Sequence, residues 1–322
     1  MKRFTVIMAA ALAALGLATA GAQEKKVRLS IGTGGTAGVY YPLGGGLAAV
    51  LSKYVPGVEA TAEVTGGSVA NLQLIGTGKS EVGFTMADSA WDAYQGFEKF
   101  KDKKVAVRTL VVFYPNRMQV ATVESTGIQK VTDLKGRRIA TGSPGSGTEV
   151  MSIRMLEAMG LDPNKDVTRE RLSLAESVAA LKDGKVDALT WVGGVPTPGL
   201  TDLAATPGKK IRLLDHGDAA EGMRKKYGPI YVKNKILANA YPGETRETTN
   251  VDVWNLLVVP ESADEKLIYE ITKTMFETKD ELVKVHKDAS FLSLDTQLTG
   301  ASPIPFHPGA LRYFKEKGLK VD

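Results

Sequence analysis

The chain has 322 residues, of which 43% are hydrophobic and 24% charged, and its formal net charge is +5. This length suits about two domains, and the composition is that of an ordinary globular protein and excludes an intrinsically disordered one. Basic residues are scattered among acids, as in Lys101-Asp102-Lys103-Lys104, and form no stripe with interleaved aromatic residues. We therefore expect no nucleic-acid partner.

The first 22 residues have the pattern of a secretory signal peptide. Lys2 and Arg3 form a basic start, an almost wholly apolar stretch covers Phe4–Leu17, and small-x-small cleavage patterns end at Ala20 and Ala22. We predict cleavage after Ala22, with Ala20 as the alternative, and a periplasmic mature protein. Loss of the two basic residues lowers the formal charge from +5 to +3. No later apolar run approaches the about 18 residues of a membrane span, so we expect a soluble mature chain.

Alternating and buried apolar segments then predict a first α/β unit. Its expected strands are Val27–Ile31, Val58–Val64, Glu81–Thr85 and Arg108–Phe113, and its expected helices are Leu43–Leu51 and Val69–Thr77. The order strand, loop, helix, strand implies a parallel sheet covered by helices.

The same pattern restarts in a second unit. Its expected strands are Met118–Val123, Arg138–Thr141 and Val186–Trp191, with a helical turn at Val131–Leu134 and helices at Thr148–Met159 and Ser177–Lys182. We expect the chain to cross between the units near Tyr114–Gln119, to return at Val251–Val259, and to end in a helical tail over Ala263–Val285. This predicts one lobe from residues 23–116, completed by a C-terminal segment of about 251–322, and a second lobe from residues 117–250.

Three Gly-rich loops each follow a predicted strand and open a helix. Glycine lets backbone N–H groups approach a ligand closely, and a helix N-terminus favours an anion. In open α/β sheets, ligands bind at the carboxyl ends of strands, so two facing units make a cleft lined by donors. The candidate ligand-binding residues in these loops are Gly34, Gly35, Thr36, Tyr40, Gly67, Ser68, Asn71, Gly145, Ser146, Gly147 and Thr148. Each loop taken alone is equally well explained as a tight turn or a helix cap.

Two nucleotide-binding motifs are excluded for the first loop. The dinucleotide fingerprint G-x-G-x-x-G fails because position 37 is alanine. A P-loop ends in G-K-[ST], and no lysine lies between positions 27 and 52.

The residues for catalysis and metal binding are also missing. The chain has no cysteine, which excludes disulfides, a lipid anchor at the cleavage site, thiol catalysis and Cys-ligated metals. His216, His286 and His307 have no metal-site spacing, and Gly-x-Ser-x-Gly does not occur. We predict no catalytic residue, metal site or cofactor. Trp191 ends a strand before Gly193-Gly194 and is a further candidate to line the cleft.

Six segments in order carry a family resemblance: TGGTAGVYYPLGGG, TGGSVANLQLI, DLKGRRIATGSPGSGTE, DGKVDALTWVGGVPTPGL, YPGE and IPFHPGALRYF. Together they resemble the TAXI-type solute-binding proteins of TRAP (tripartite ATP-independent periplasmic) transporters, over roughly Val27 to Gly318. The resemblance implies a type II periplasmic binding-protein fold, two α/β lobes joined by a hinge. It also implies a membrane permease partner driven by an ion gradient, and a ligand such as glutamate or a C4/C5 dicarboxylate.

Arg117 departs from what this resemblance leads us to expect. It lies at the first crossing, where it is either a carboxylate clamp specific to the ligand or a partner in a structural salt bridge, the latter being favoured.

The predicted function is capture of a small anionic solute by hinge closure and its delivery to a permease, by a monomeric protein. Two alternatives remain open: a secreted enzyme acting on an anionic substrate, and a binding protein that serves a sensor kinase.

Overall fold

The computed structural model describes residues 26–298 and 300–320. The predicted signal peptide and its cleavage site lie outside these residues. Within them, no helix is both long enough and apolar enough to cross a bilayer.

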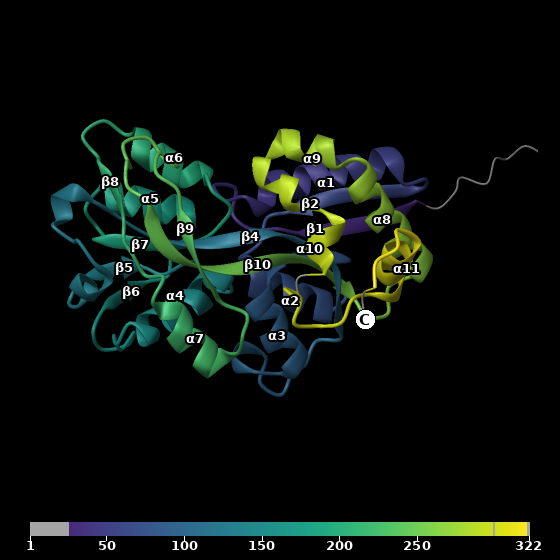
Figure 1. Ribbon diagram of the computed structural model, residues 1–322, viewed down its shortest axis with the longest axis horizontal. Helices are drawn as coiled ribbons and strands as arrows, with labels where there is room; N and C mark the ends of the chain where they lie inside the picture. Colours follow the sequence, from purple (N-terminus) through teal and green to yellow (C-terminus); the bar gives the residue numbers. More distant parts are fainter. Residues whose placement is uncertain (1–25, 299, 321–322) are drawn as a thin grey trace, which may run out of the picture.

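One mixed sheet of ten strands runs through the molecule (Figure 1). The strand order is β2-β1-β3-β10-β4-β7-β5-β6, with β8 beside β4 and β9 beside β10. The strands are β1 (Val27–Gly32), β2 (Val58–Glu63), β3 (Val82–Met86), β4 (Val107–Val123), β5 (Arg138–Ala140), β6 (Thr168–Glu170), β7 (Ala188–Gly193), β8 (Ile211–Leu213), β9 (Val232–Ile236) and β10 (Thr248–Pro260). Parallel pairing is confirmed for β1 with β2 and β3, and for β5 with β6 and β7. The prediction was wrong for β4 and β10, which are antiparallel to their neighbours.

The two long strands β4 and β10 connect the halves of the molecule. The sequence predicted two strands separated by a crossing near Tyr114–Gln119, whereas β4 is continuous over 17 residues. Pro115, which has no N–H to donate, lies opposite Trp254, where the β4–β10 ladder is irregular but not broken. The strand expected at Val251–Val259 is confirmed as β10. The lobe boundaries at residues 116 and 250 stay predictions.

The helices cover this sheet. They are α1 (Tyr40–Tyr54), α2 (Ser68–Gly76), α3 (Ala87–Gln95), α4 (Gly147–Ala158), α5 (Leu174–Lys182), α6 (Pro198–Ala205), α7 (Ala219–Tyr227), α8 (Glu265–Glu277), α9 (Lys279–Val285), α10 (Leu294–Gln297) and α11 (Pro308–Glu316), with 3₁₀ turns at Glu98–Phe100, Glu124–Thr126, Val131–Leu134 and Lys287–Phe291. The single tail helix predicted over residues 263–285 was wrong, because the chain breaks at Thr278, whose φ is −112° and whose hydroxyl donates to the Thr274 carbonyl. The break turns α9 onto α1, where Val285 packs closely on Gly46.

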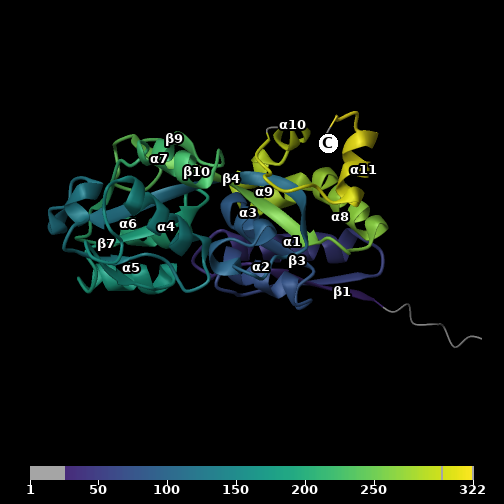
Figure 2. The same ribbon diagram turned by 90° about the horizontal axis from the view of Figure 1, so that it is seen from below.

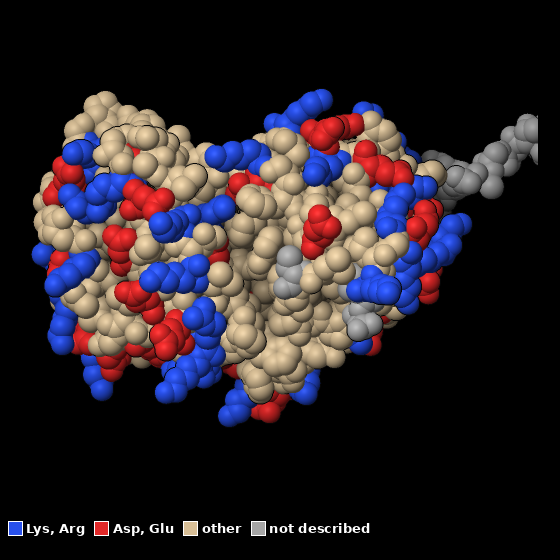
Figure 3. Space-filling view, viewed as in Figure 1, with Lys and Arg blue, Asp and Glu red and all other residues tan. Residues whose placement is uncertain are grey.

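Two lobes lie side by side along the long axis (Figures 1 and 2). We call the first lobe β1–β3 with α1–α3 and α8–α11, and the second lobe β5–β9 with α4–α7. A cluster of buried apolar side chains, among them Val178, Leu189 and Leu200, lies in the second lobe and at the end of β4. A larger cluster fills the first lobe and continues along the crossing strands to α4 and α7. On the face shown in Figure 3, acids and bases are interspersed over the second lobe, in agreement with scattered rather than striped charge.

A buried ionic group joins the lobes; we call it the Arg154 cluster, made of Arg154, Asp88, Asp92 and Tyr231. Arg154 of α4 donates to Asp92 of α3 over 2.6 Å and to the Tyr231 hydroxyl over 2.8 Å. Its Nη1 lies 3.6 Å from Asp88, which accepts from the Tyr231 hydroxyl over 2.9 Å. Burial raises the pKa of Asp92 to about 6, against the opposing attraction of Arg154. A cation therefore holds together two acids of the other lobe.

Candidate functional site

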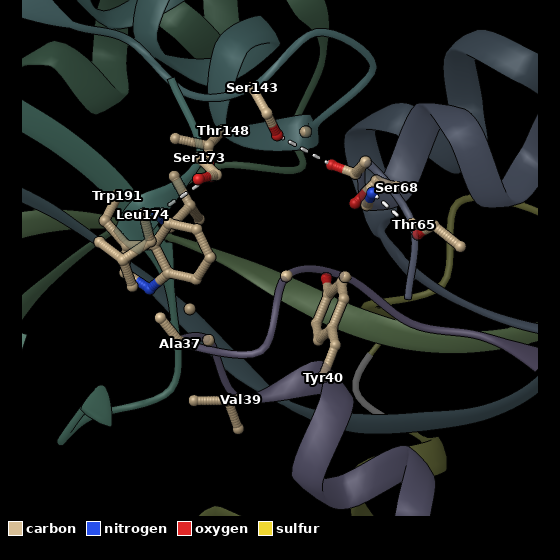
Figure 4. A pocket seen from close by; sticks show the side chains of 18 of the residues that line it. Ala37, Val39, Tyr40, Thr65, Ser68, Ser143, Thr148, Ser173, Leu174 and Trp191 are labelled. Atoms are coloured by element: carbon tan, nitrogen blue, oxygen red, sulfur yellow. Dashed lines mark hydrogen bonds between the residues drawn. The ribbon is translucent and has the colours of Figure 1, made fainter. Parts of the chain in front are cut away.

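A cavity of about 330 Å³ lies between the lobes (Figure 4). Its walls come from the segments that open α1, α2, α4 and α5 and from the end of β7. Nine of the predicted residues line it: Gly34, Gly35, Thr36, Tyr40, Gly67, Ser68, Gly147, Thr148 and Trp191. Four do not: Asn71, Arg117, Gly145 and Ser146. Among the described residues, the lining contains no acidic, basic or histidine side chain.

The loop after β1 offers uncommitted backbone donors. Within the described chain, the amides of Gly34, Gly35 and Thr36 have no hydrogen-bond acceptor. The first N–H groups of any α-helix lack intrahelical partners. Helix α1, which follows this loop, has no side-chain cap to satisfy them. Gly38 is required here by packing, because a Cβ at this position would lie 2.9 Å from the Trp191 ring. The loop therefore presents neutral donors to the cavity.

Tyr40 is held as a neutral phenol beside these donors. Its ring packs on Phe84, with ring centroids 5.1 Å apart, and its hydroxyl accepts from Asn116 Nδ2 over 3.1 Å. Burial raises the pKa of Tyr40 to about 12, although hydrogen bonds from Ser68, Asn116 and Asn255 act in the opposite direction. At neutral pH the phenol thus retains its proton and can donate it.

The second loop divides into residues that face the cavity and one that supports it. Gly67 has φ of +110°, which favours glycine, and Ser68 begins α2. The Ser68 hydroxyl accepts from the Met86 amide over 3.1 Å. Asn71 is fully buried; its Nδ2 donates to the carbonyls of Thr33 and Phe84 over 2.7 and 2.8 Å. Asn71 therefore fixes the shape of both loops in the first lobe and does not reach the cavity.

The third loop divides in the same way. Gly147 and Thr148 line the cavity, and the Thr148 hydroxyl accepts from the Val192 amide over 3.3 Å. The Ser146 hydroxyl instead caps α4, accepting from the Glu149 amide over 3.0 Å. Gly145 has φ of +79°, and its carbonyl points across to the first lobe. The alternative interpretation as a helix cap therefore describes Ser146.

Hydrogen bonds between the lobes close the cavity on two sides. On one side the Ala70 amide donates to the Gly145 carbonyl over 3.0 Å, and the Ser143 hydroxyl donates to the Gly66 carbonyl over 3.3 Å. On the other side the Gly199 amide donates to the Ala37 carbonyl over 3.1 Å. In this structure the two lobes are therefore in direct contact through backbone and side-chain hydrogen bonds on both of these sides.

The Arg117 side chain interacts with Asp288 and Phe291 and does not line the cavity. Its Nη1 lies 3.9 Å from Asp288, and its guanidinium lies over the Phe291 ring at 5.7 Å. Asp288 also accepts from the Val195 amide over 3.0 Å. Of the two interpretations that the sequence left open, the salt bridge is the one present in this structure.

The segment Ser173–Ala175 lines the cavity and was missed by the sequence analysis. It has no glycine to mark it, but Ser173 and Glu176 form a capping box that opens α5. The S-x-x-E spacing of a capping box could have predicted the start of this helix from the sequence. Thr65, Met86 and Ser143 line the cavity as well.

None of the three histidines lines the cavity. His286 and His307 accept from backbone amides at helix starts, and His216 lies 2% exposed with Nδ1 2.8 Å from the Leu214 carbonyl. The described residues contain no group of three or more acids and histidines placed to hold a metal ion.

His216 is expected to make stability depend on pH. Burial lowers its pKa from 6.5 to about 4. As the pH falls from 6.5 to 4, the unfolded chain binds a proton at this ring and the folded chain does not. Stability present above pH 6.5 is therefore lost on acidification, by roughly 3 kcal/mol at about 1.4 kcal/mol per pH unit.

The measurement is urea unfolding of the wild type and of His216→Gln at pH 7 and pH 4.5. The wild type should lose more stability than the variant, since other titrating groups are common to both. Parallel pH profiles for the two proteins would contradict this assignment.

Comparisons with known proteins show which family and which solved structures this chain is similar to. A family model described as "NMT1-like family" matches residues 31–318. A protein from Bordetella bronchiseptica RB50 is 18% identical, with 90% of this chain and 89% of that chain covered and a TM-score of 0.52. The alkanesulfonate-binding protein SsuA from Xanthomonas axonopodis pv. citri, bound to MOPS, is 19% identical, with 90% and 84% covered and a TM-score of 0.49. A putative L-cystine ABC transporter from Listeria monocytogenes is 17% identical, with 81% and 94% covered and a TM-score of 0.49. The predicted α/β fold with two lobes is confirmed by the structure, and the Bordetella bronchiseptica protein is similar to it in fold.

Proposed function

Because this chain belongs to the NMT1-like family, we propose that it is an extracytoplasmic solute-binding protein that captures a small anionic solute and delivers it to a membrane permease. The observation that carries the proposal is the cavity between two lobes that meet through hydrogen bonds from loop to loop. Its uncommitted backbone amides and hydroxyls suit an anion. In the part of the chain that the structure describes, its lining contains no acid, base or histidine that could act as a general base for a nucleophile, which argues against the alternative of a secreted enzyme.

Capture follows from the closed geometry. A solute entering the open form would meet the Gly34–Tyr40 loop and the start of α2 on one lobe and the start of α4 on the other. Neutral hydrogen bonds contribute roughly 0.5–1.5 kcal/mol each, so donors from both lobes must act together for useful affinity. The solute therefore favours closure, and a permease can distinguish the closed form from the open one.

A thermal-shift screen of small carboxylates and sulfonates tests this proposal. A ligand at 100 times its dissociation constant adds about 2.7 kcal/mol to the free energy of unfolding, which is measurable as a rise in melting temperature. Isothermal titration calorimetry should then give one site per chain. If no anion of the panel shifts the melting temperature, the proposed function is wrong.

Closure itself is testable with an engineered disulfide, since the chain has no cysteine of its own. A Cβ built on Gly199 lies 3.4 Å from the Ala37 Cβ, close to the separation of about 3.5–4.5 Å in disulfides, and 2.9 Å from the Leu174 side chain, which must shift to admit it. We expect the oxidised Ala37→Cys/Gly199→Cys variant to bind the tightest solute of the screen about tenfold more slowly or worse, because the lobes cannot part. Reduction should restore the rate.

The single variant Ala37→Cys, which cannot form the disulfide within one chain, is the control, and mass spectrometry confirms the cross-link in the double variant. An oxidised, cross-linked protein that binds at the wild-type rate would show that entry does not require the lobes to separate at this point.

The TAXI resemblance supports a finer proposal, in which the permease is of the TRAP type and the protein works in the periplasm. Uptake into vesicles that contain the permease should then stop when an ionophore dissipates the ion gradient, and should not require ATP. If uptake instead required ATP, the permease would not be of the TRAP type and the protein would serve another importer. If the protein bound a solute but supported no uptake, the sensor-kinase alternative would be favoured.

A further inference from the structure

The cavity has two chemically different ends. In Figure 4, Thr65 and Ser68 lie on one side, and Trp191 and Leu174 lie on the opposite side beside the neutral hydroxyl residues Thr148 and Ser173. The Tyr40 hydroxyl points into the space between. The side of Ser68 is also where α2 begins, with no side-chain cap on its first N–H groups. At the other end, the Trp191 Nε1 is buried beside Gly193 and has no hydrogen-bond partner within the described chain; it is a neutral donor and carries no charge.

Nothing in the lining would neutralise a second charge on a ligand. A dicarboxylate would place one carboxylate among Trp191, Leu174 and Ala37, where no cationic side chain lies. Arg117, the cation that the sequence analysis offered for this role, is paired with Asp288 instead. An unpaired buried charge costs several kcal/mol.

An α-amino acid meets the opposite difficulty. Its ammonium needs a carboxylate, and the lining formed by residues 26–298 and 300–320 has none. Asp88, behind Tyr40, is fully buried and already accepts from the Tyr231 hydroxyl and the Ser89 amide.

We propose that the ligand is a monoanion with a single oxyanion head and an uncharged, mainly apolar body. The head binds where α1 and α2 begin, near Ser68 and the Tyr40 hydroxyl, and the body lies against Leu174 and Trp191. This rests on the proposed function and narrows it. It differs from the glutamate or C4/C5 dicarboxylate that the family resemblance implies.

Two matched pairs of ligands test the charge requirement by calorimetry on the mature protein at pH 7.5. Hexanoate and adipate have the same number of carbons and differ by one terminal carboxylate; 4-methylpentanoate and leucine differ by the ammonium. The monoanion of each pair should bind about tenfold more tightly or better. Equal or tighter binding of adipate or leucine overturns this inference and leaves the proposed function standing.

A charge introduced at the apolar end gives a second readout. Ala175 lines the cavity next to Leu174 and is exposed, so Ala175→Lys should fold and place an ammonium there. The preference for hexanoate over adipate should fall about tenfold or more in this variant. Ala179→Lys is the matched control: it is exposed one turn later on α5, lies outside the cavity, and should keep the wild-type preference.

The outcomes separate the two proposals. If Ala175→Lys binds both acids in the wild-type ratio, the apolar end is misplaced and the inference fails. If none of the four ligands binds but another anion of the thermal-shift panel does, the inference fails alone. If nothing in the panel binds, the proposed function fails as well.

Discussion

Replacing Gly147 with valine is expected to weaken solute binding by about 100-fold or more, which corresponds to about 2.7 kcal/mol. Gly147 is the first residue of α4 in the second lobe and faces the first lobe. A Cβ at this position would lie 2.8 Å from the Ser68 hydroxyl and would press on the Met86 methyl group. Any side chain there therefore acts as a wedge between the start of α2 and the start of α4. Calorimetry with the tightest solute of the screen measures the loss.

Gly45→Val is the matched control. Gly45 lies within α1, and nothing is within 4 Å of a Cβ built on it, so binding should remain within about twofold of wild type, and the higher helix propensity of valine should if anything raise stability slightly. Circular dichroism checks that both variants fold. A folded Gly147→Val protein with wild-type affinity would show that the start of α4 takes no part in closure.

Arg154→Met is expected to destabilise the protein by about 3–5 kcal/mol, because it leaves buried acids without their cation. The Arg154 side chain is 4% exposed, and those of Asp88 and Asp92 are 0% and 8% exposed. The loss should be smaller at pH 5 than at pH 7.5, since protonation of Asp92 removes part of the unpaired charge. Urea unfolding at both values measures the effect.

Two companion variants make this result interpretable. Lys185→Met breaks an ion pair whose side chains are 73% and 57% exposed, and should cost less than about 1 kcal/mol. Adding Asp92→Asn to Arg154→Met should recover part of the lost stability. If the Arg154→Met protein is as stable as wild type, the prediction is wrong: the Arg154 cluster would then determine how the two lobes contact each other without adding to the free energy of unfolding.

Most of the cavity could be predicted from sequence because glycine marks the places where a strand gives way to a helix and a ligand can approach. Gly34, Gly67 and Gly147 all lie where that rule puts them. Neighbours within the same loops could not be separated in this way. Ser146 and Thr148 are both short hydroxyl residues at the start of α4, yet one caps the helix and the other lines the cavity. Which of them faces the ligand depends on the phase of the helix, which a loop motif does not specify.

The residues whose role depends on distant partners were beyond sequence reasoning. Arg117 is paired with Asp288 and Arg154 with Asp92, and no local pattern marks either pair. The continuous strand β4 was hidden by Pro115, since a proline usually interrupts a strand; here the partner strand accommodates it with an irregular register. The Ser173–Ala175 segment of the second lobe was not predicted because it lacks the glycine that marked the other three loops.

The position of β10 has a consequence for the order in which the chain folds as it is synthesised. This strand lies between β3 and β4, so the facing edges of both strands have no partner until residues 248–260 have been made. Gln297 and His307 later add hydrogen bonds to the backbone of β4, at Val112 and Thr109. Such pairing between distant segments forms slowly. The second lobe is built from one continuous stretch of chain and, apart from β9, which pairs with β10, it can form early, whereas the lobe that contains the N-terminus is completed last.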